Sequence, residues 1–196
     1  LKHIANITVK FGRPAVVAIN RFPADTEAEL ALVRRKCEEM GANVALSEVW
    51  AKGGEGGLEL AEEVLRLTEK PNHFRMMYAD EQPLREKIEA VVQEIYGGDG
   101  VDYLPAAARE LDKLENLGYG CLPVCMAKTQ YSLSDNPALT GWPKGFRVTV
   151  KNVRLSAGAG FVVVLTGDIM TMPGLPKVPA AEAIDVDADG RITGLF

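Results

Sequence analysis

A continuous apolar run, PAVVAIN at residues 14–20, is the sequence feature that most limits what this chain can fold into. Runs of strand length without polar alternation are typical of strands buried on both faces of a parallel sheet. A helix is predicted directly after the run, because Thr26 followed by Glu29 makes a capping box. Its apolar residues recur at helical spacing until Gly41, and they are Leu30, Val33, Cys37 and Met40.

The next segments repeat the alternation of strand and helix. Residues 43–47, NVALS, are typical of a second strand, and the glycine-rich turn KGGEGG at residues 52–57 leads into a second helix. The residues expected on the inward face of this helix are Leu58, Ala61 and Leu65. In an open parallel sheet the functional crevice lies beyond the carboxyl ends of the strands. Those ends are residues 20–25 and 47–57.

The second half of the chain mixes helices with strands. Pro83 opens a predicted helix that Gly97 stops, and another helix is predicted over residues 105–117. The predicted strands are residues 74–78, 122–127, 146–155, 161–167 and 169–172. Within one of them, Phe146, Val148 and Val150 alternate with polar residues, which indicates one covered face, as antiparallel sheets usually have.

The predicted fold class is therefore α/β. Residues 1–80 form a β-α-β-α piece of a parallel sheet, and residues 81–196 form an α+β region with antiparallel strands. A chain of 196 residues with 47% hydrophobic residues is long and apolar enough to bury a core.

Composition excludes several classes of function. A net charge of −5, from 27 acidic and 22 basic residues, gives no general attraction for nucleic acid. No apolar run approaches the ~18 residues that a membrane-spanning helix needs, so no membrane partner is expected. The three cysteines follow no disulfide pattern and no signal peptide precedes them, so we expect a cytoplasmic protein. Because the sequence starts with Leu1 rather than Met, we expect a fragment of a longer chain.

Two patterns that resemble metal sites are given structural interpretations. Cys121 and Cys125 have no histidine at a spacing suited to zinc, so they are predicted to be buried structural thiols. The acidic residues within 185–189 lack the glutamate that closes a calcium-binding loop, so this segment is predicted to be a turn. With two histidines in the chain, no nucleophile–histidine arrangement is predicted. The sequence therefore predicts neither a metal ligand nor a catalytic residue.

Two aromatic residues follow the two predicted strands. Phe22 comes directly after the first strand and before Pro23, and Trp50 comes after the second strand. Neighbouring parallel strands lie roughly 4.8 Å apart, so two such rings can straddle a flat heterocycle, which needs ring planes about 7 Å apart. The alternative stays open: Phe22 caps the core at the end of the strand, and Trp50 is a core or interface residue.

The turn at residues 52–57 is a candidate anion site. Backbone N–H groups at the start of a helix favour anions, and Lys52, with Gly53 and Gly54 beside it, lies where its ammonium can reach a phosphate or carboxylate. The turn matches neither the dinucleotide-binding pattern nor the P-loop pattern. The alternative is an ordinary chain turn with a solvated lysine.

Four longer segments resemble formate–tetrahydrofolate ligase, also called 10-formyltetrahydrofolate synthetase. The segments are AINRFPADTEAEL, VALSEVWAKGGEGGLELA, GYGCLPVCMAKTQYSLSD and TMPGLPKVPAAEAIDVDADGRITGLF. Together they make the whole chain similar to the carboxyl-terminal third of that enzyme. The resemblance implies an ATP-dependent ligation of formate to tetrahydrofolate through formyl phosphate, giving 10-formyltetrahydrofolate, ADP and phosphate.

The resemblance also implies a site for the pterin ring of the folate. In the family, an aromatic residue in the NRFP segment and the tryptophan of the WAKGG segment hold the pterin between them, with a leucine of the preceding strand alongside. These roles fall on Phe22, Trp50 and Leu46, with Pro23 next to the first ring.

The same strand ends offer candidate nucleotide or phosphate contacts. Asn20 and Asp25 at the first strand end, together with Lys52, Gly53 and Gly54 at the second, make up this set. Asn20 and Asp25 are separated by four residues, more than in the base-reading loops of P-loop GTPases, which argues against a nucleotide-base role.

Finally, the resemblance implies that parts of the enzyme lie elsewhere. The family's P-loop and the basic residues that hold formyl phosphate belong to its amino-terminal part, which this sequence lacks, so the chain alone is expected to be inactive. Its parallel strands then belong to a P-loop NTPase-like domain. ATP with Mg²⁺ and tetrahydrofolate are substrates of the whole enzyme, a monovalent cation stimulates the family, and no cofactor is tightly bound.

The implied partners are the amino-terminal part and the other subunits of a homotetramer. The alternative is an assembly module that binds no ligand of its own.

Overall fold

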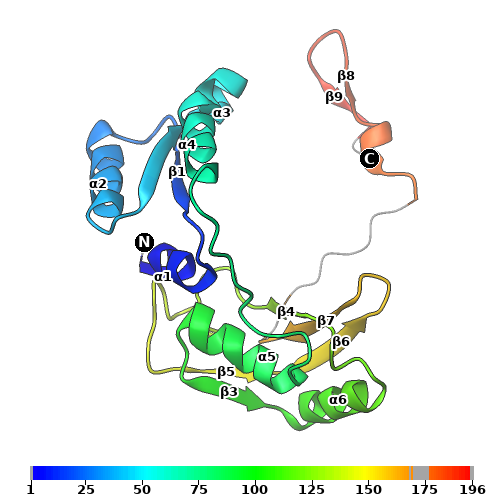
Figure 1. The fold of residues 1–196 in the computed structure, drawn as a ribbon. Coiled ribbons are helices and arrows are strands. Elements are labelled where there is room, and N and C mark those ends of the chain that lie inside the picture. Colours follow the sequence, from blue (N-terminus) through cyan, green and yellow to red (C-terminus); the bar gives the residue numbers. More distant parts are fainter. Residues whose placement is uncertain (1, 168, 170–176, 195–196) are drawn as a thin grey trace.

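The computed structural model describes residues 2–167, 169 and 177–194. A strand pair with its helices and a second group of helices and strands are joined by an extended segment (Figure 1). The predicted strand at residues 169–172 lies outside the described residues, apart from residue 169. In the part of the chain that the structure describes, no helix is long and apolar enough to cross a membrane.

The first strand pair is parallel, as predicted. β1 (Val16–Asn20) and β2 (Asn43–Ser47) pair residue for residue along their whole length. The helix between them, α2 (Glu27–Glu38), begins at the predicted capping box. The Thr26 hydroxyl accepts from the Glu29 amide at 3.3 Å, and the Glu29 carboxylate accepts from the Thr26 amide at 2.9 Å. The start of this β-α-β unit was thus readable from local sequence rules.

Three helical segments follow β2. They are α3 (Val49–Lys52), the 3-10 helix η1 (Gly53–Gly57) and α4 (Leu58–Thr68). The predicted inward face of α4 is wrong, because Leu58 and Leu65 are 59% and 66% exposed. Instead, Leu67 is buried and Leu60 is half-buried, two turns apart on another face of the helix.

The prediction that the first strand is buried on both faces is also wrong. Every residue of β1 keeps some exposed surface, and on β2 only Ala45 and Ser47 are buried. Among the described residues this sheet has two strands, so each strand keeps an open edge. The α2 helix turns Leu30 and Cys37 inward as predicted, whereas Val33 is 38% exposed.

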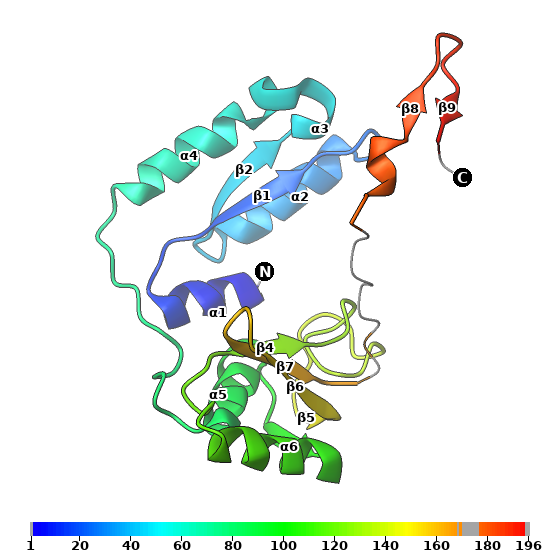
Figure 2. The same ribbon diagram turned by 90° about the vertical axis from the view of Figure 1, so that its right-hand side faces the viewer.

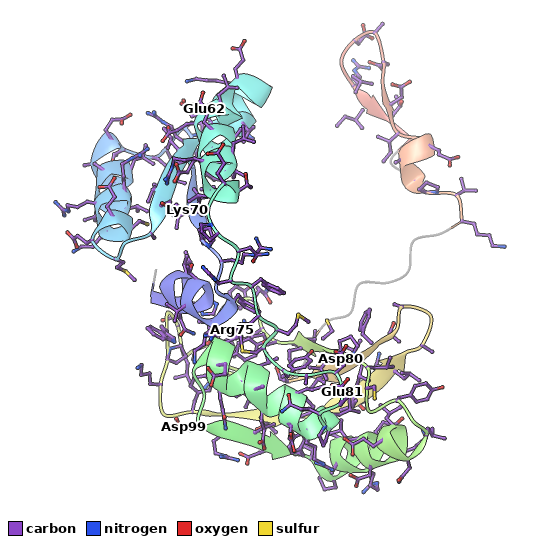
Figure 3. All side chains as sticks on the ribbon, in the orientation of Figure 1. Glu62, Lys70, Arg75, Asp80, Glu81 and Asp99 are labelled. Atoms are coloured by element: carbon purple, nitrogen blue, oxygen red, sulfur yellow. The ribbon has the colours of Figure 1, made fainter. Side chains whose placement is uncertain are left out.

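The extended segment between the two groups makes hydrogen bonds to the first helix of the chain, α1 (Lys2–Phe11). The Arg75 guanidinium donates to two carbonyls in the last turn of α1, at 2.8 and 3.1 Å, and the Arg75 amide donates to the Phe11 carbonyl at 3.1 Å. Figure 3 shows Arg75 on this segment, next to α1. The predicted strand at residues 74–78 is wrong, because Arg75 bonds the open end of a helix rather than a neighbouring strand.

The second group contains helices and two sheets. Its helices are α5 (Leu84–Ala90), the π-helical segment η2 (Val91–Tyr96) and α6 (Pro105–Asn116). Its strands are β3 (Gly100–Tyr103), β4 (Val124–Ala127), β5 (Arg147–Val150), β6 (Asn152–Ser156) and β7 (Phe161–Leu165). β3 pairs with β5 and β4 pairs with β7, both in parallel, whereas β6 pairs with β7 antiparallel. The mixture of helices and strands is as predicted. Of the strand pairs described in residues 81–196, the predicted antiparallel arrangement holds for β6–β7 and for the short pair near the end of the chain, residues 185–186 with 192–193.

The core lies between these helices and strands, and Figure 2 shows α5 and α6 below β4, β6 and β7. Phe146, Val148 and Val150 point inward as predicted, at 8%, 1% and 0% exposure. Their alternation marks a parallel pair, contrary to the prediction, because the outer face of β3–β5 is left to solvent. On that face Arg147 Nη2 pairs with Asp102 Oδ1 across the strands at 2.8 Å.

The two patterns that resembled metal sites have different outcomes. The acidic segment forms a turn, as predicted, between β8 (Asp185–Val186) and β9 (Ile192–Thr193), after the short helix η3 (Ala180–Glu182). Cys121 and Cys125 are free and exposed, so the prediction of buried thiols is wrong. Cys125 faces outward because its neighbours on β4, Val124 and Met126, pack against the core.

Candidate functional site

The carboxyl ends of β1 and β2 lie side by side, as the parallel arrangement requires. Asn20 stands opposite Ser47, and the Arg21 amide donates to the Ser47 carbonyl at 2.9 Å, one residue beyond the end of β1. The segments that follow the two strands therefore start from adjacent points. This edge is where the sequence predicts a functional crevice.

Phe22 is held away from the core by a tight local turn. Its amide donates to the Asp25 carboxylate at 2.7 Å, and the Asp25 amide donates back to the Phe22 carbonyl at 3.0 Å. Pro23 lies inside this turn and fixes its backbone angle. Phe22 is 51% exposed, which removes the alternative that it caps the core. Asp25 is engaged in shaping the turn.

Trp50 lies on α3 and is 71% exposed, so it is not a core residue of this chain. Its ring centroid is 6.4 Å from that of Phe22, and the two ring planes are inclined by 48°. The structure thus brings the two predicted aromatic residues together, in a tilted rather than a parallel arrangement.

A shallow cleft of about 90 Å³ opens between these rings. Its lining residues are Arg21, Phe22, Pro23, Glu48, Trp50 and Ala51. Leu46 is half-buried on β2 and Asn20 is exposed at the end of β1, and neither belongs to the cleft lining. Ligand pockets usually measure roughly 300–1,000 Å³. The cleft as it stands therefore accommodates the edge of a ring rather than a whole cofactor-sized ligand.

Glu48 joins the cleft to two cationic side chains. Its carboxylate accepts from Lys52 Nζ at 2.6 Å and lies 3.7 Å from Arg21 Nη1. Arg21 also pairs with Glu27. The hydrogen bond from Lys52 lowers the pKa of Glu48, helped by the charges of Lys52 and Arg21 and opposed by partial desolvation. Glu48 is therefore ionised at neutral pH.

The glycine-rich turn packs against the backbone of Glu48, one of the residues that line the cleft. The Glu48 amide donates to the Gly56 carbonyl at 2.9 Å. A Cβ added to Gly56 would lie 2.4 Å from the Glu48 carbonyl carbon, so a side chain cannot fit there. Gly53 has φ +59°, a conformation that favours glycine, and Gly54 faces open space. Gly56 therefore has a packing role and Gly53 a conformational one, whether or not an anion binds.

Sequence reasoning did not single out Glu48. It is the first residue after β2, and functional residues lie beyond the carboxyl ends of parallel strands. The position in sequence that indicated Phe22 and Trp50 would therefore also have indicated Glu48. In the described part of the chain, no group of three or more His, Cys, Asp or Glu side chains could hold a metal ion.

The family of this chain can be established by comparison with known proteins. The sequence matches the family described as formate–tetrahydrofolate ligase over residues 1–196. It is 61% identical over 196 residues to the formate–tetrahydrofolate ligase of Symbiobacterium thermophilum, a match that covers 100% of this chain and 35% of that protein. The chain thus spans about a third of the length of this relative. By this match along its whole length, the chain belongs to the formate–tetrahydrofolate ligase family.

Proposed function

We propose that this chain is the carboxyl-terminal part of an ATP-dependent ligase that joins formate to tetrahydrofolate through formyl phosphate, and that it supplies the pterin-stacking pocket. The single observation that carries the proposal is the pair of exposed rings, Phe22 and Trp50, with centroids 6.4 Å apart at adjacent strand ends. Pro23 stiffens the turn that carries Phe22. Leu46, on β2, is proposed to lie alongside the pterin. Exposed apolar patches mark interaction sites or ligand-binding grooves, and aromatic rings stack favourably with other flat rings.

Opening the pair for a pterin needs a small movement. The rings are inclined by 48°, and a parallel sandwich needs planes about 7 Å apart. Trp50 is 71% exposed, so its side chain has room to rotate. Each aromatic face would contribute about 1–3 kcal/mol by analogy with base stacking. The ligand itself would then complete the site.

The phosphate chemistry of the reaction is assigned to another part of the enzyme. Residues 1–80 would complete a P-loop NTPase-like domain and residues 81–196 would form a separate α+β domain. Contacts from Asn20, Gly53 and Gly54 to a nucleotide or phosphate remain part of the proposal. For Asp25 and Lys52, such contacts require release of the bonds that each makes within the site.

The isolated chain is proposed to be inactive, and the complete enzyme to be a cytoplasmic homotetramer. ATP and Mg²⁺ would be handled by the remaining part, because the family resemblance places the P-loop there. The monovalent cation is likewise not assigned to these residues. In calorimetry of the chain with ATP and Mg²⁺ we expect no heat of binding.

Calorimetric titration of the chain with tetrahydrofolate, kept anaerobic, tests the folate pocket. We expect Trp50→Ala to weaken binding about tenfold to hundredfold, the equivalent of one lost stacking contact. Tyr131→Ala is the matched control, because Tyr131 is also an exposed aromatic residue, at 68%, outside the cleft. Equal affinities for the unmutated chain and Trp50→Ala would contradict the stacking role.

A second candidate function is an assembly module. It is favoured by the apolar face of α4, where Leu58 and Leu65 are 59% and 66% exposed. Sedimentation velocity of the isolated chain separates the two functions. A monomer with measurable folate affinity supports the pocket, whereas an oligomer without folate affinity supports assembly.

A further inference from the structure

Among the described residues that line the cleft, Glu48 supplies the one carboxylate, and the stacking of a ring between Phe22 and Trp50 leaves that carboxylate without a role. It follows β2 directly, and it lines the cleft together with Phe22 and Trp50. Its side chain is 24% exposed, much less than either ring. A carboxylate in this position can meet the edge of a flat ligand whose faces are covered by the two aromatic residues.

The position of Glu48 is fixed from both the side chain and the backbone. Lys52 bonds one carboxylate oxygen at 2.6 Å, and Arg21 lies 3.7 Å from the other. The backbone is held by the bond from the Glu48 amide to Gly56 and by their close contact. A carboxylate offers about four acceptor sites on its two oxygens, so acceptor capacity remains for a ligand.

A pterin presents complementary chemistry along one edge. Its 2-amino group and the neighbouring ring N–H are two parallel donors, and a carboxylate can accept from both at once. Apolar faces give affinity without orientation, whereas a small number of placed polar groups fix which way a ring enters. Both cationic neighbours keep Glu48 charged, and charged acceptors make the stronger hydrogen bonds.

We propose that Glu48 is the specificity-determining residue of the pocket, which accepts two hydrogen bonds from the aminopyrimidinone edge of the pterin and orients the ring between Phe22 and Trp50. The inference rests on the proposed function, since it names the group that recognises the folate at the same site. Arg21 and Lys52 act as positioning residues that hold this carboxylate. Gly56 supports it from behind.

The experiment is a cycle that changes the residue and the ligand together. Affinities of folic acid and of its 2-desamino-2-methyl analogue are measured by calorimetry for the unmutated chain and for Glu48→Gln. The unmutated chain should prefer folic acid by about tenfold to hundredfold, as expected for hydrogen bonds to a charged group. Glu48→Gln should lose most of that preference, because its amide offers one acceptor oxygen and places an N–H₂ group against the ligand's donors.

Two further variants separate the possible results. Glu27→Gln is the matched control, because Glu27 also pairs with Arg21 but lies outside the cleft lining, and it should keep the preference. If Trp50→Ala weakens binding while Glu48→Gln keeps the full preference for folic acid, the role of Glu48 is overturned and the stacking pocket stands. If the unmutated chain binds neither ligand, the proposed pocket fails, and the inference fails with it.

Discussion

Gly56 approaches Glu48 so closely that a Cβ on Gly56 would lie 2.4 Å from both the carbonyl carbon and the carbonyl oxygen of Glu48. The contact is between two backbones, so no flexible side chain can move aside. The glycine-rich turn thereby fixes the position of the backbone that follows β2 and carries Glu48 and Trp50. Gly56 itself does not line the cleft, but a change at Gly56 should reach it through the backbone of Glu48.

Gly56→Ala should both destabilise the chain and weaken folate binding. Forcing a methyl group into a packed contact costs about 1–3 kcal/mol, and the backbone shift would move Trp50 relative to Phe22. The matched control is Gly54→Ala, because an added Cβ there meets nothing within 4 Å. Urea denaturation and folate calorimetry measure the two effects. Equal stability of Gly56→Ala and Gly54→Ala would contradict the packing role.

Local rules predicted β1, α2, β2 and α4, but not which faces of these elements are exposed. The Thr26–Glu29 capping box and the turn glycines involve near neighbours in sequence, so the start of α2 and the end of the first unit were readable. Which side of α4 faces the strands is a matter of tertiary packing, and Leu67 rather than Leu65 is buried there. The contacts of α4 with β1 and β2 join residues distant in sequence, so the choice of Leu58 and Leu65 as inward residues could not be checked against them.

The same distinction applies to the site. Phe22 and Trp50 could be placed together because parallel strands in register bring their following residues to one edge. The ion pair of Glu48 with Lys52 forms because the single turn of α3 brings the two side chains together. No sequence pattern predicted this short helix. Likewise, the parallel pairing of β3 with β5 joins strands more than 40 residues apart, so nearby sequence carries no signal for it.

Lys87 should be a strong determinant of stability in the second group. It is fully buried, and its ammonium donates to the carbonyls of Asp80, Gly120 and Leu122 at 2.7, 2.8 and 3.0 Å. Lys87→Met keeps the length of the side chain but leaves three carbonyls without this donor. Asp80 is exposed, so water can replace the donor there, whereas Gly120 and Leu122 are half-buried. Since an unsatisfied buried group costs about 1–3 kcal/mol, we expect a loss of about 3 kcal/mol in urea denaturation.

The control for that variant is Lys113→Met on α6. Lys113 is 62% exposed and pairs with Glu110 at 3.1 Å, so its loss should change stability by less than about 1 kcal/mol. A Lys87→Met chain as stable as Lys113→Met would mean that the three carbonyls find other donors. Hydrogen exchange of residues 119–123 would then remain unchanged as well.

The capping box of α2 should make stability depend on acidic pH. The hydrogen bonds from the Thr26 amide and hydroxyl lower the pKa of Glu29 below 4.5. A lowered pKa means that the ionised form stabilises the fold, so this contribution is present above about pH 4.5 and is lost as pH falls through the folded-state pKa. Glu29→Gln cannot titrate, and urea denaturation from pH 6 to pH 3 should show a shallower decline for the variant.

Glu62→Gln is the control for this pH series, because Glu62 is an exposed glutamate on α4 and Figure 3 shows it at the surface of that helix. Its decline in stability with falling pH should parallel that of the unmutated chain. If Glu29→Gln also parallels the unmutated chain, the capping carboxylate is not coupled to folding.

Arg75 should hold α1 in place by occupying its open end. The last carbonyls of a helix lack partners within it, and a cation there also meets the negative end of the helix dipole. Arg75→Ala removes the two guanidinium bonds to that turn but keeps the amide bond to Phe11. Amide exchange in α1 should therefore quicken by about tenfold, while exchange in α6 stays unchanged. Arg109→Ala, at an exposed arginine of α6, should leave α1 as protected as before. Equal protection of α1 in both variants would show that the backbone bond to Phe11 is sufficient to hold the helix.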